Sequence, residues 1–487
     1  MNLSTKPYRL LPFRFERKGD EVLLVNDVGS FHFIAKPVFD KFCKYELESG
    51  SSALLDLESG GFLCRESPAQ VIEWLATRYR TKKQFLFEST ALHMFVVTQR
   101  CNQRCAYCHA SSISGETSMD FDMNMETARR AVEMAFASPS PYLKIELQGG
   151  EPLLNFDAVR EIIEYALQIN AEARRKLEFV ICSNLAALDQ DKAKYLKDKD
   201  VAVSTSLDGS ATLHDTCRKM TSGAGSYGLA TRGMRLLREE LGYPRLSALT
   251  TVTGFNIDHL RGVVDEYVAQ GLESVFLRPL NPFGRAKIEW GGLGYAAERY
   301  LSAYADTLEY ILKLNLSGRY LREEYATILL TKILTPHSTG FVDLQSPAGC
   351  GISGVIYDTS GNIYVSDEAR MLARSGDHRF CIGNVHSSSW KEAFGGHVLR
   401  GVIAQSCIES LPGCAWCVYQ PYCGCDPVRN YGACGNLAIA RYQDGFCQIN
   451  KGIFDILFRY LKEGDEEIKD IFWSWITARP LAEIWES

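Results

Sequence analysis

The sequence lacks any apolar run near the roughly 18 residues that a membrane-spanning helix needs. Its opening, MNLSTKPYRLLPFRFERKGDEV, has no apolar segment that ends in a small-residue cleavage site, so we predict no secretory signal. It also lacks a charge excess: 53 basic and 59 acidic residues give a net charge of −6, which attracts neither nucleic acid nor an anionic membrane. These absences predict a cytoplasmic protein that binds neither membrane nor nucleic acid.

Cysteine is the residue type that stands out, since the 487 residues contain 16 cysteines but no internal repeat and no low-complexity segment. Thiols stay reduced in the cytoplasm, so such cysteines indicate metal binding or catalysis more often than disulfides. Three lie within 101–108 and nine within 350–447. The other four are scattered, and we interpret them as small buried side chains: Cys43, Cys64, Cys182 and Cys217.

The hydrophobic pattern predicts an α/β protein with five segments. In residues 1–88, β-rich runs precede amphipathic helices, an order typical of a winged-helix-like module. Residues 89–285 alternate six short β-rich runs with helical stretches, which predicts a partial (β/α)6 TIM-like barrel. We expect a helical bridge at 286–345, a cysteine-rich domain at 346–451 and C-terminal helices at 452–487.

The stretch TQRCNQRCAYCHAS carries a cysteine triplet directly after the first β-rich run of the barrel segment. Cys101, Cys105 and Cys108 are separated by three and then two residues. A closed structural metal site needs four ligands, whereas three thiolates leave one position open for chemistry. Because active sites of such barrels lie on the loops after the strands, we predict an active site here. Taken alone, the triplet also fits a zinc site or a chance arrangement.

The triplet, with Tyr107 before its third cysteine, resembles the radical S-adenosylmethionine superfamily. Three further stretches carry the resemblance: QGGEPLL after the second β-rich run, STSLDG after the fourth, and HDTCR behind it. The resemblance implies that three thiolates bind three irons of a [4Fe–4S] cluster and that S-adenosylmethionine chelates the fourth iron. Reductive cleavage of the sulfonium then yields a 5′-deoxyadenosyl radical, and the protein supplies the positioning.

The resemblance also assigns roles to single residues. Cys101, Cys105 and Cys108 would hold the cluster and form the catalytic centre. The remaining residues would contact S-adenosylmethionine: Tyr107 near the adenine, Gly149, Gly150 and Glu151 at the methionine moiety, Ser206 at the ribose and Arg218 at the carboxylate. The third β-rich run ends in SNLAA, which lacks the glycine that commonly follows Asn184 in the family, so no role is assigned there.

The C-terminal cysteines resemble a SPASM domain, which holds auxiliary iron–sulfur clusters. CAWCVYQPYCGCD places four cysteines at spacings of two, five and one residues, whereas a bare pair of C-x2-C units would favour zinc. The resemblance implies one or two auxiliary [4Fe–4S] clusters. The outer one would be held by Cys414, Cys417, Cys423 and Cys447, and the inner one served by Cys350 and Cys425. Three cysteines have no counterpart and are interpreted as structural: Cys381, Cys407 and Cys434.

The chain departs from the SPASM pattern at Ser366, where a cysteine is expected after Gly361. A serine hydroxyl is a poor iron ligand, whereas a carboxylate is acceptable though harder than thiolate. Three outcomes stay open: Asp367 ligates, a cysteine such as Cys381 or Cys434 replaces it, or one iron of the inner cluster remains open. We expect an inner cluster that is not held by four cysteines; the alternative is that it is absent.

Enzymes of this kind mostly modify ribosomally made peptides, so the resemblance implies a precursor peptide with a leader as substrate and an intrapeptide crosslink as product. Forming such a bond after hydrogen abstraction is a two-electron oxidation, and auxiliary clusters would accept the second electron. The expected electron donor is of flavodoxin or ferredoxin type. The N-terminal module resembles domains that dock a leader as an added strand, here against 21–35. LLPFRF and SDEAR are most similar to maturases of the His-Xaa-Ser peptide system.

Two other functions remain open. An enzyme similar to anaerobic sulfatase maturases would oxidise a cysteine or serine on a target protein. A non-enzymatic scaffold would carry a zinc ribbon on a dead barrel, although the complete triplet and the intact Gly-Gly-Glu argue against it.

Overall fold

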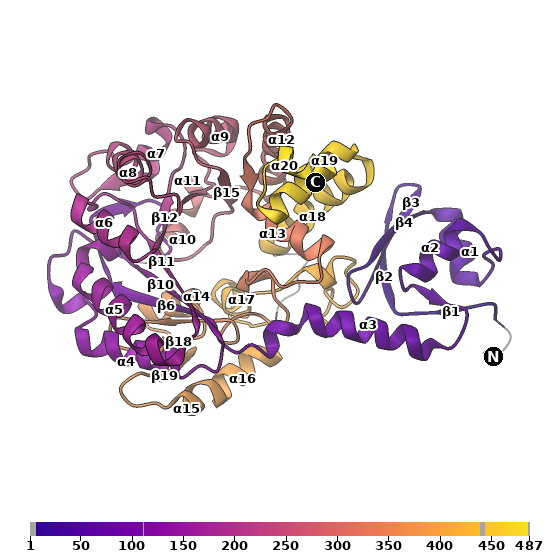
Figure 1. The fold of residues 1–487 in the computed structure, drawn as a ribbon, viewed down its shortest axis with the longest axis horizontal. Helices are drawn as coiled ribbons and strands as arrows, with labels where there is room; N and C mark the ends of the chain where they lie inside the picture. Colours follow the sequence, from indigo (N-terminus) through magenta and orange to yellow (C-terminus); the bar gives the residue numbers. More distant parts are fainter. Residues whose placement is uncertain (1–5, 111, 439–443, 486–487) are drawn as a thin grey trace.

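A parallel α/β barrel occupies the middle of the chain in the computed structural model, which describes residues 6–110, 112–438 and 444–485 (Figure 1). The six β-rich runs of the sequence form its strands, which lie parallel in the order of the chain. They are β6 (Leu92–Thr98), β10 (Tyr142–Gly149), β11 (Lys176–Cys182), β12 (Ala202–Ser206), β14 (Leu246–Thr251) and β15 (Ser274–Arg278). The predicted fold class is confirmed.

Helices cover the outer face of this sheet because alternate strand residues are apolar. In β10, Leu143, Ile145 and Leu147 are fully buried against the helices, while Lys144 and Glu146 point to the opposite, inner face. The covering helices are α4 (Met125–Phe136), α5 (Phe156–Ala173), α6 (Gln190–Asp198), α8 (Tyr227–Arg235) and α9 (Leu260–Ala269). On β10 the inner face is thus left to polar side chains.

The barrel sheet continues into the cysteine-rich region. β17 (Gly354–Tyr357) pairs in parallel with β6, followed by antiparallel β18 (Asn362–Tyr364) and β19 (Cys381–Asn384). At the other edge β16 (Arg322–Glu323) pairs with β15, which completes a sheet of ten strands within the described residues. The helices of this part are α14 (Asp367–Arg374), α15 (Trp390–Gly395), α16 (His397–Ala404) and α17 (Pro427–Cys434). Backbone hydrogen bonds therefore fix the position of the cysteine-rich region relative to the barrel.

The N-terminal module is a three-stranded antiparallel sheet with helices on one face. β3 (Glu21–Asn26) lies between β2 (Phe13–Lys18) and β4 (Phe31–Ala35), so that β2 and β4 are the edge strands. Helices α1 (Lys36–Lys44) and α2 (Ser52–Ser59) pack on it, and α3 (Pro68–Lys82) leads to the barrel (Figure 1). Two short strands pair beside it: β1 (Arg9–Leu10) and β5 (Leu63–Cys64).

The other face of this sheet packs against α18 (Gly445–Glu463), more than 400 residues further along the chain. The Phe31 and Phe458 rings meet edge to face with centroids 5.0 Å apart, and the Tyr422 hydroxyl donates to the Gly29 carbonyl at 2.8 Å. Lys451 forms an ion pair with Glu16 at 3.0 Å. The module is therefore fastened to the C-terminal helices and is not a separate appendage.

Other helices fill the space between barrel and C-terminus, where the Trp475 side chain is fully buried. They are α12 (Ala297–Leu316), α13 (Glu324–Leu334), α19 (Glu466–Thr477) and α20 (Leu481–Trp485), with the short α10 (Gly284–Ile288) and α11 (Trp290–Leu293) at the mouth of the barrel. Among the helices of the described ranges, none is both long and apolar enough to cross a membrane.

Candidate active site

The cysteine triplet lies on the loop after β6, and three neighbouring segments hold this loop in place. Its short strand β7 (Arg100–Cys101) pairs with β9 (Ile113–Ser114). Its second short strand, β8 (Gln103–Cys105), pairs with β13 (Arg218–Met220), which follows α7 (Ala211–Cys217). Arg285 in α10 donates from its side chain to the Cys105 carbonyl and from its backbone to the Cys108 carbonyl, both at 2.9 Å. The three thiols are thus presented on a fixed backbone.

The surroundings of the thiols fit a cluster that carries negative charge. Burial raises the pKa of Cys101 to about 12 and that of Cys105 to about 11, while the positive charges of Arg218 and Arg285 act against the shift at Cys105. Gln103 is 1% exposed, and its Nε2 has no hydrogen-bond partner. An unused buried amide beside the thiols suits the sulfides of a cluster, since buried donors are otherwise almost always satisfied.

Within the described residues, no three His, Cys, Asp or Glu side chains converge on the position of a single metal ion. A [4Fe–4S] cluster does not need such convergence, because each thiolate binds a different iron. When bound, the cluster and S-adenosylmethionine would supply the radical chemistry. Cys101, Cys105 and Cys108 are the residues that would hold the cluster.

Gly149 and Gly150 end β10 and lie against the cysteine loop. A Cβ atom on Gly149 would lie 2.3 Å from the Thr98 carbonyl oxygen, and one on Gly150 only 2.1 Å from that of Arg100. The Gly150 N–H donates to Thr98 and the Glu151 N–H to Arg100, both at 2.8 Å. These glycines are therefore needed for the contact between two loops, a reason that the sequence analysis, which attributed them to approach of the cofactor, did not anticipate.

Glu151 is fully buried and connects the second and third strand ends. Its carboxylate accepts hydrogen bonds from the Ser183 hydroxyl at 2.6 Å and the Asn184 N–H at 2.8 Å, and burial raises its pKa. Asn184 in turn donates to Asn102 at 2.9 Å, with its Nδ2 4.0 Å from the Cys101 sulfur. SNLAA, which received no role from the sequence, thus belongs to the site.

Leu185 explains how this loop dispenses with glycine. Its φ of 61° lies in the left-handed region that glycine adopts without penalty, and its side chain is fully buried. The backbone strain of a non-glycine residue there is about 1–3 kcal/mol, which burial of a leucine offsets. Leu185 thus holds a backbone conformation that glycine would adopt without strain.

Tyr107 and Arg218 lie in contact, and Tyr107 also binds Asp208, an acid to which the sequence analysis assigned no role. Arg218 donates to the Tyr107 hydroxyl at 2.7 Å, and this hydroxyl donates to Asp208 at 2.5 Å. All three side chains are buried. Asp208 is the acid of STSLDG, so the signal was present in the quoted motif. Ser206 ends β12 and is partly exposed.

The four cysteines assigned to the outer cluster lie near one another. Cys414, Cys417 and Cys447 all interact with Cys423, whose pKa is raised by burial and then by these thiols. The Cys417 N–H donates to the Cys414 carbonyl at 3.0 Å, which closes the turn between them. The structure thus gathers these residues, while their ligation stays a prediction. Cysteines without an assigned role lie on β19, after α16 and at the end of α17: Cys381, Cys407 and Cys434.

Cys350 and Cys425 are also close, and carboxylates surround them. Both thiols are buried, and the Cys350 sulfur lies 4.0 Å from an Asp426 carboxylate oxygen. Burial and the charges of Asp426 and Glu368 raise the pKa of Cys350. Burial also raises the pKa of Asp426 to about 6. The inner cysteine pair therefore has acidic neighbours that the sequence analysis did not name.

Ser366 has a structural role in place of the missing cysteine. Its hydroxyl accepts from the Ala369 N–H at 3.3 Å and caps the N-terminus of α14. Asp367, the carboxylate proposed as a ligand from the sequence, is bound to Arg370 at 2.8 Å. Among the three possibilities left open for the inner cluster, this geometry favours ligation by Asp367 least. Asp367 is paired with Arg370, whereas the carboxylates whose charges reach Cys350 are those of Glu368 and Asp426.

Residues 95–267 match the family model of the radical SAM superfamily. This segment, which carries the cysteine triplet, is similar to the radical SAM superfamily. The protein is therefore an enzyme that uses S-adenosylmethionine and a [4Fe–4S] cluster, and its C-terminal cysteines fit auxiliary clusters. The alternative of a non-enzymatic scaffold is wrong.

Two curated relatives share sequence with the domain. An uncharacterised protein of Methanocaldococcus jannaschii is 29% identical over 187 residues, which are 38% of this chain and 61% of that protein. A cysteine-type anaerobic sulfatase-maturating enzyme of Clostridium novyi (strain NT) is 23% identical over 367 residues, 74% of this chain and 92% of the relative. The match thus spans about three fifths of the first protein and nearly all of the second.

Two solved structures share the fold. Native anSMEcpe with bound AdoMet superposes with a TM-score of 0.65 at 19% identity and covers 76% of this chain and 98% of its own. SuiB of Streptococcus suis, bound to precursor peptide SuiA, has a TM-score of 0.51 at 13% identity and covers 91% and 100%. At these low sequence identities, the superpositions show that this chain shares the fold of the two proteins and nothing further about it.

Replacing Cys105 tests the triplet. The anaerobically reconstituted, reduced protein should cleave S-adenosylmethionine to 5′-deoxyadenosine, and Cys105→Ala should abolish cleavage because one iron loses its ligand. Product is measured by chromatography. Cys43→Ala is the matched control: the interpretation of Cys43 as a buried side chain is wrong, since it is exposed in α1 of the N-terminal module, away from the triplet. Cleavage by the Cys105 variant would remove the triplet from the mechanism.

Gly150→Ala tests the contact between the two loops. The added methyl group clashes with the Arg100 carbonyl and should displace the cysteine loop, lowering cleavage of S-adenosylmethionine at least tenfold. Gly228→Ala, in the first turn of α8, is the control, because no atom lies within 4 Å of its Cβ position and alanine fits there without a clash. Equal activity of the two variants would contradict the stated reason for glycine.

Iron counting tests the auxiliary sites. Three four-iron clusters give roughly twelve irons per chain and two give roughly eight. We expect about twelve, falling to about eight in Cys350→Ala, and no change in Asp367→Ala because Arg370 already binds that carboxylate. About eight irons in both the parent and the Cys350 variant would show that no inner cluster forms.

Proposed function

We propose that the protein modifies a ribosomally made precursor peptide, taking a hydrogen atom with the 5′-deoxyadenosyl radical and closing an intrapeptide crosslink. The observation that carries the proposal is the N-terminal module. Its sheet packs beside the cysteine-rich region, and its edge strand β4 pairs on one side only within the described residues. The fold of SuiB, solved with its precursor peptide, spans 91% of this chain, against 76% for anSMEcpe. Within such enzymes, LLPFRF and SDEAR favour the maturases of the His-Xaa-Ser system.

The docking site for a leader is the edge of β4. Strand β3, inside the predicted range 21–35, is paired on both sides, whereas β4 pairs with β3 alone in the described part of the chain. An extended peptide adds to such an edge through backbone hydrogen bonds. Helix α3 passes the start of β4, where Arg78 donates to Ser30 at 3.3 Å, and it exposes 53% of Ile72. The exposed Ile72 of α3 gives apolar side chains of a leader a group to pack against.

The second electron of the crosslinking reaction would pass to the auxiliary clusters, and a flavodoxin- or ferredoxin-type protein would supply the first electron. Trp416, between Cys414 and Cys417, is 83% exposed, so the outer cysteine site lies at the surface. An electron from the substrate can therefore pass through the auxiliary clusters to a partner protein that binds at this surface.

A second candidate is oxidation of a cysteine or serine on a target protein. The Clostridium novyi relative is named a cysteine-type anaerobic sulfatase-maturating enzyme. The alignment over 92% of that relative and the better superposition of anSMEcpe favour it. Both candidates use the same radical chemistry and differ in the product.

Mass spectrometry of a short peptide encoded beside the gene separates the two candidates. After anaerobic reaction, a crosslinked peptide is lighter by two hydrogen atoms, resists hydrazines and yields fragments joined across the bond. An aldehyde from cysteine or serine forms a hydrazone instead. A hydrazone product would replace the first candidate by the second.

Ile72→Ser tests leader docking. Deletion of residues 1–88 is unsuitable, since it would uncover Phe458 and Tyr422. The exposed Ile72 is replaceable at a cost within about 0.5 kcal/mol, and loss of its apolar contact should weaken peptide binding about tenfold. Fluorescence anisotropy measures the affinity. Glu73→Gln, at the next, exposed position of α3, is the control. Unchanged affinity would exclude α3 from docking.

A further inference from the structure

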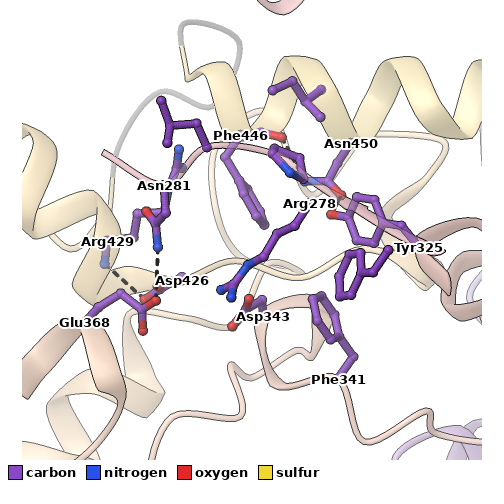
Figure 2. Close-up of a pocket in the computed structure, with 14 residues that line it drawn as sticks. Arg278, Asn281, Tyr325, Phe341, Asp343, Glu368, Asp426, Arg429, Phe446 and Asn450 are labelled. Carbon is purple, nitrogen blue, oxygen red and sulfur yellow. Dashed lines mark hydrogen bonds between the residues drawn. The ribbon is translucent and has the colours of Figure 1, made fainter. Parts of the chain in front are cut away.

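A cavity of about 70 Å³ lies between the end of β15 and the cysteine-rich region (Figure 2). Arg278 and Asn281 line it from the barrel, Glu368 and Asp426 from α14 and the start of α17, and Phe446 from α18. The segment after β15 also carries Arg285, which holds the cysteine loop. The cavity therefore lies between the radical cofactor site and the inner cysteine pair.

Hydrogen-bond acceptors dominate the polar part of this cavity. The side-chain Nδ2 of Asn281 donates to Glu368 at 3.3 Å, and its side-chain carbonyl oxygen, Oδ1, is buried without a partner. Glu368 and Asp426 are only 8% and 5% exposed, and the backbone N–H groups of Val428 and Arg429 occupy just one Asp426 oxygen. The acceptor oxygens that remain on this side of the cavity can therefore bind a hydrogen-bond donor.

Negative charge is in excess here. Among the described residues, three carboxylates line the cavity with two guanidinium groups, and one of these, Arg429, is paired with a fourth carboxylate, Asp444, at 3.2 Å. That leaves Arg278 to face Asp343, Glu368 and Asp426, as Figure 2 shows. A buried surplus of negative charge is costly unless a cation joins it.

Aromatic rings form the opposite wall. Phe276 and Tyr325 are stacked with centroids 5.7 Å apart, and Phe341 lies 5.9 Å from Tyr325. The Tyr325 hydroxyl is satisfied by Asn450 at 2.6 Å, so this wall offers ring faces and no free donor. Ring faces attract cations, and their apolar surface suits an aliphatic stem.

We propose that this cavity binds a positively charged side chain of the substrate, of the lysine or arginine type. The ammonium or guanidinium group meets Glu368, Asp426 and the Asn281 carbonyl, and the aliphatic stem lies along the aromatic wall. The inference rests on the proposed function, since it names the residue type that the enzyme holds between its radical site and the inner cysteines.

Binding of small probes to the reconstituted holoenzyme tests this without turnover. N-acetyl-lysine methylamide should bind in saturation-transfer NMR titrations, and the norleucine analogue, which has the same stem without the ammonium, should bind at least tenfold more weakly. Glu368→Gln and, separately, Asp343→Asn should each weaken the lysine probe about tenfold. Glu467→Gln, exposed in the first turn of α19, should not.

Iron content is measured in every variant, so that loss of a cluster is not mistaken for loss of the site. Equal binding of both probes, or unchanged lysine binding in Glu368→Gln and Asp343→Asn at parental iron content, would overturn the inference. Cleavage of S-adenosylmethionine and peptide modification are assayed on the same samples. An enzyme that modifies a peptide without preferring the lysine probe defeats only this inference, and one that prefers the probe but modifies no peptide defeats only the proposed function.

Discussion

The contact of the Gly149–Gly150 backbone with the carbonyls of Thr98 and Arg100 is the constraint on which the site depends. It requires residues without side chains, and it shifts the register between β10 and β6 at this point. Two backbone hydrogen bonds then fix the cysteine loop against the second strand. The same turn delivers Glu151 into the interior, where it organises the end of the third strand. One steric requirement thus places residues from three strands.

The barrel was predictable because its strands are short apolar runs separated by helical stretches, and neighbouring strands in the sequence are neighbours in the sheet. The strands that extend the sheet were not, since β16 to β19 have only two to four residues each and carry no periodicity of their own. Their positions result from pairing with β15 and β6.

Within the site, the sequence motifs identified most of the residues, whereas the contacts in the structure show how these residues are arranged. Tyr107, Asp208 and Arg218 belong to separate stretches, and only the fold shows that they form one hydrogen-bonded chain. Leu185 shows the opposite case, because the missing glycine left this loop without a role, whereas the leucine adopts a left-handed conformation that glycine favours. Ser366 was predictable: a serine followed by two acids is a common helix start, and that role competes with metal ligation.

Helix α18 contains both Cys447, near its first turn, and Phe458, which packs on the N-terminal sheet. They lie eleven positions apart, or about 16 Å at 1.5 Å per residue. A helix of this length is stiff, so Cys447 and the N-terminal sheet keep a fixed spacing along one rod. Tilting this helix displaces the sheet and the cysteine together, and under the proposed function it would couple leader docking to the outer cluster.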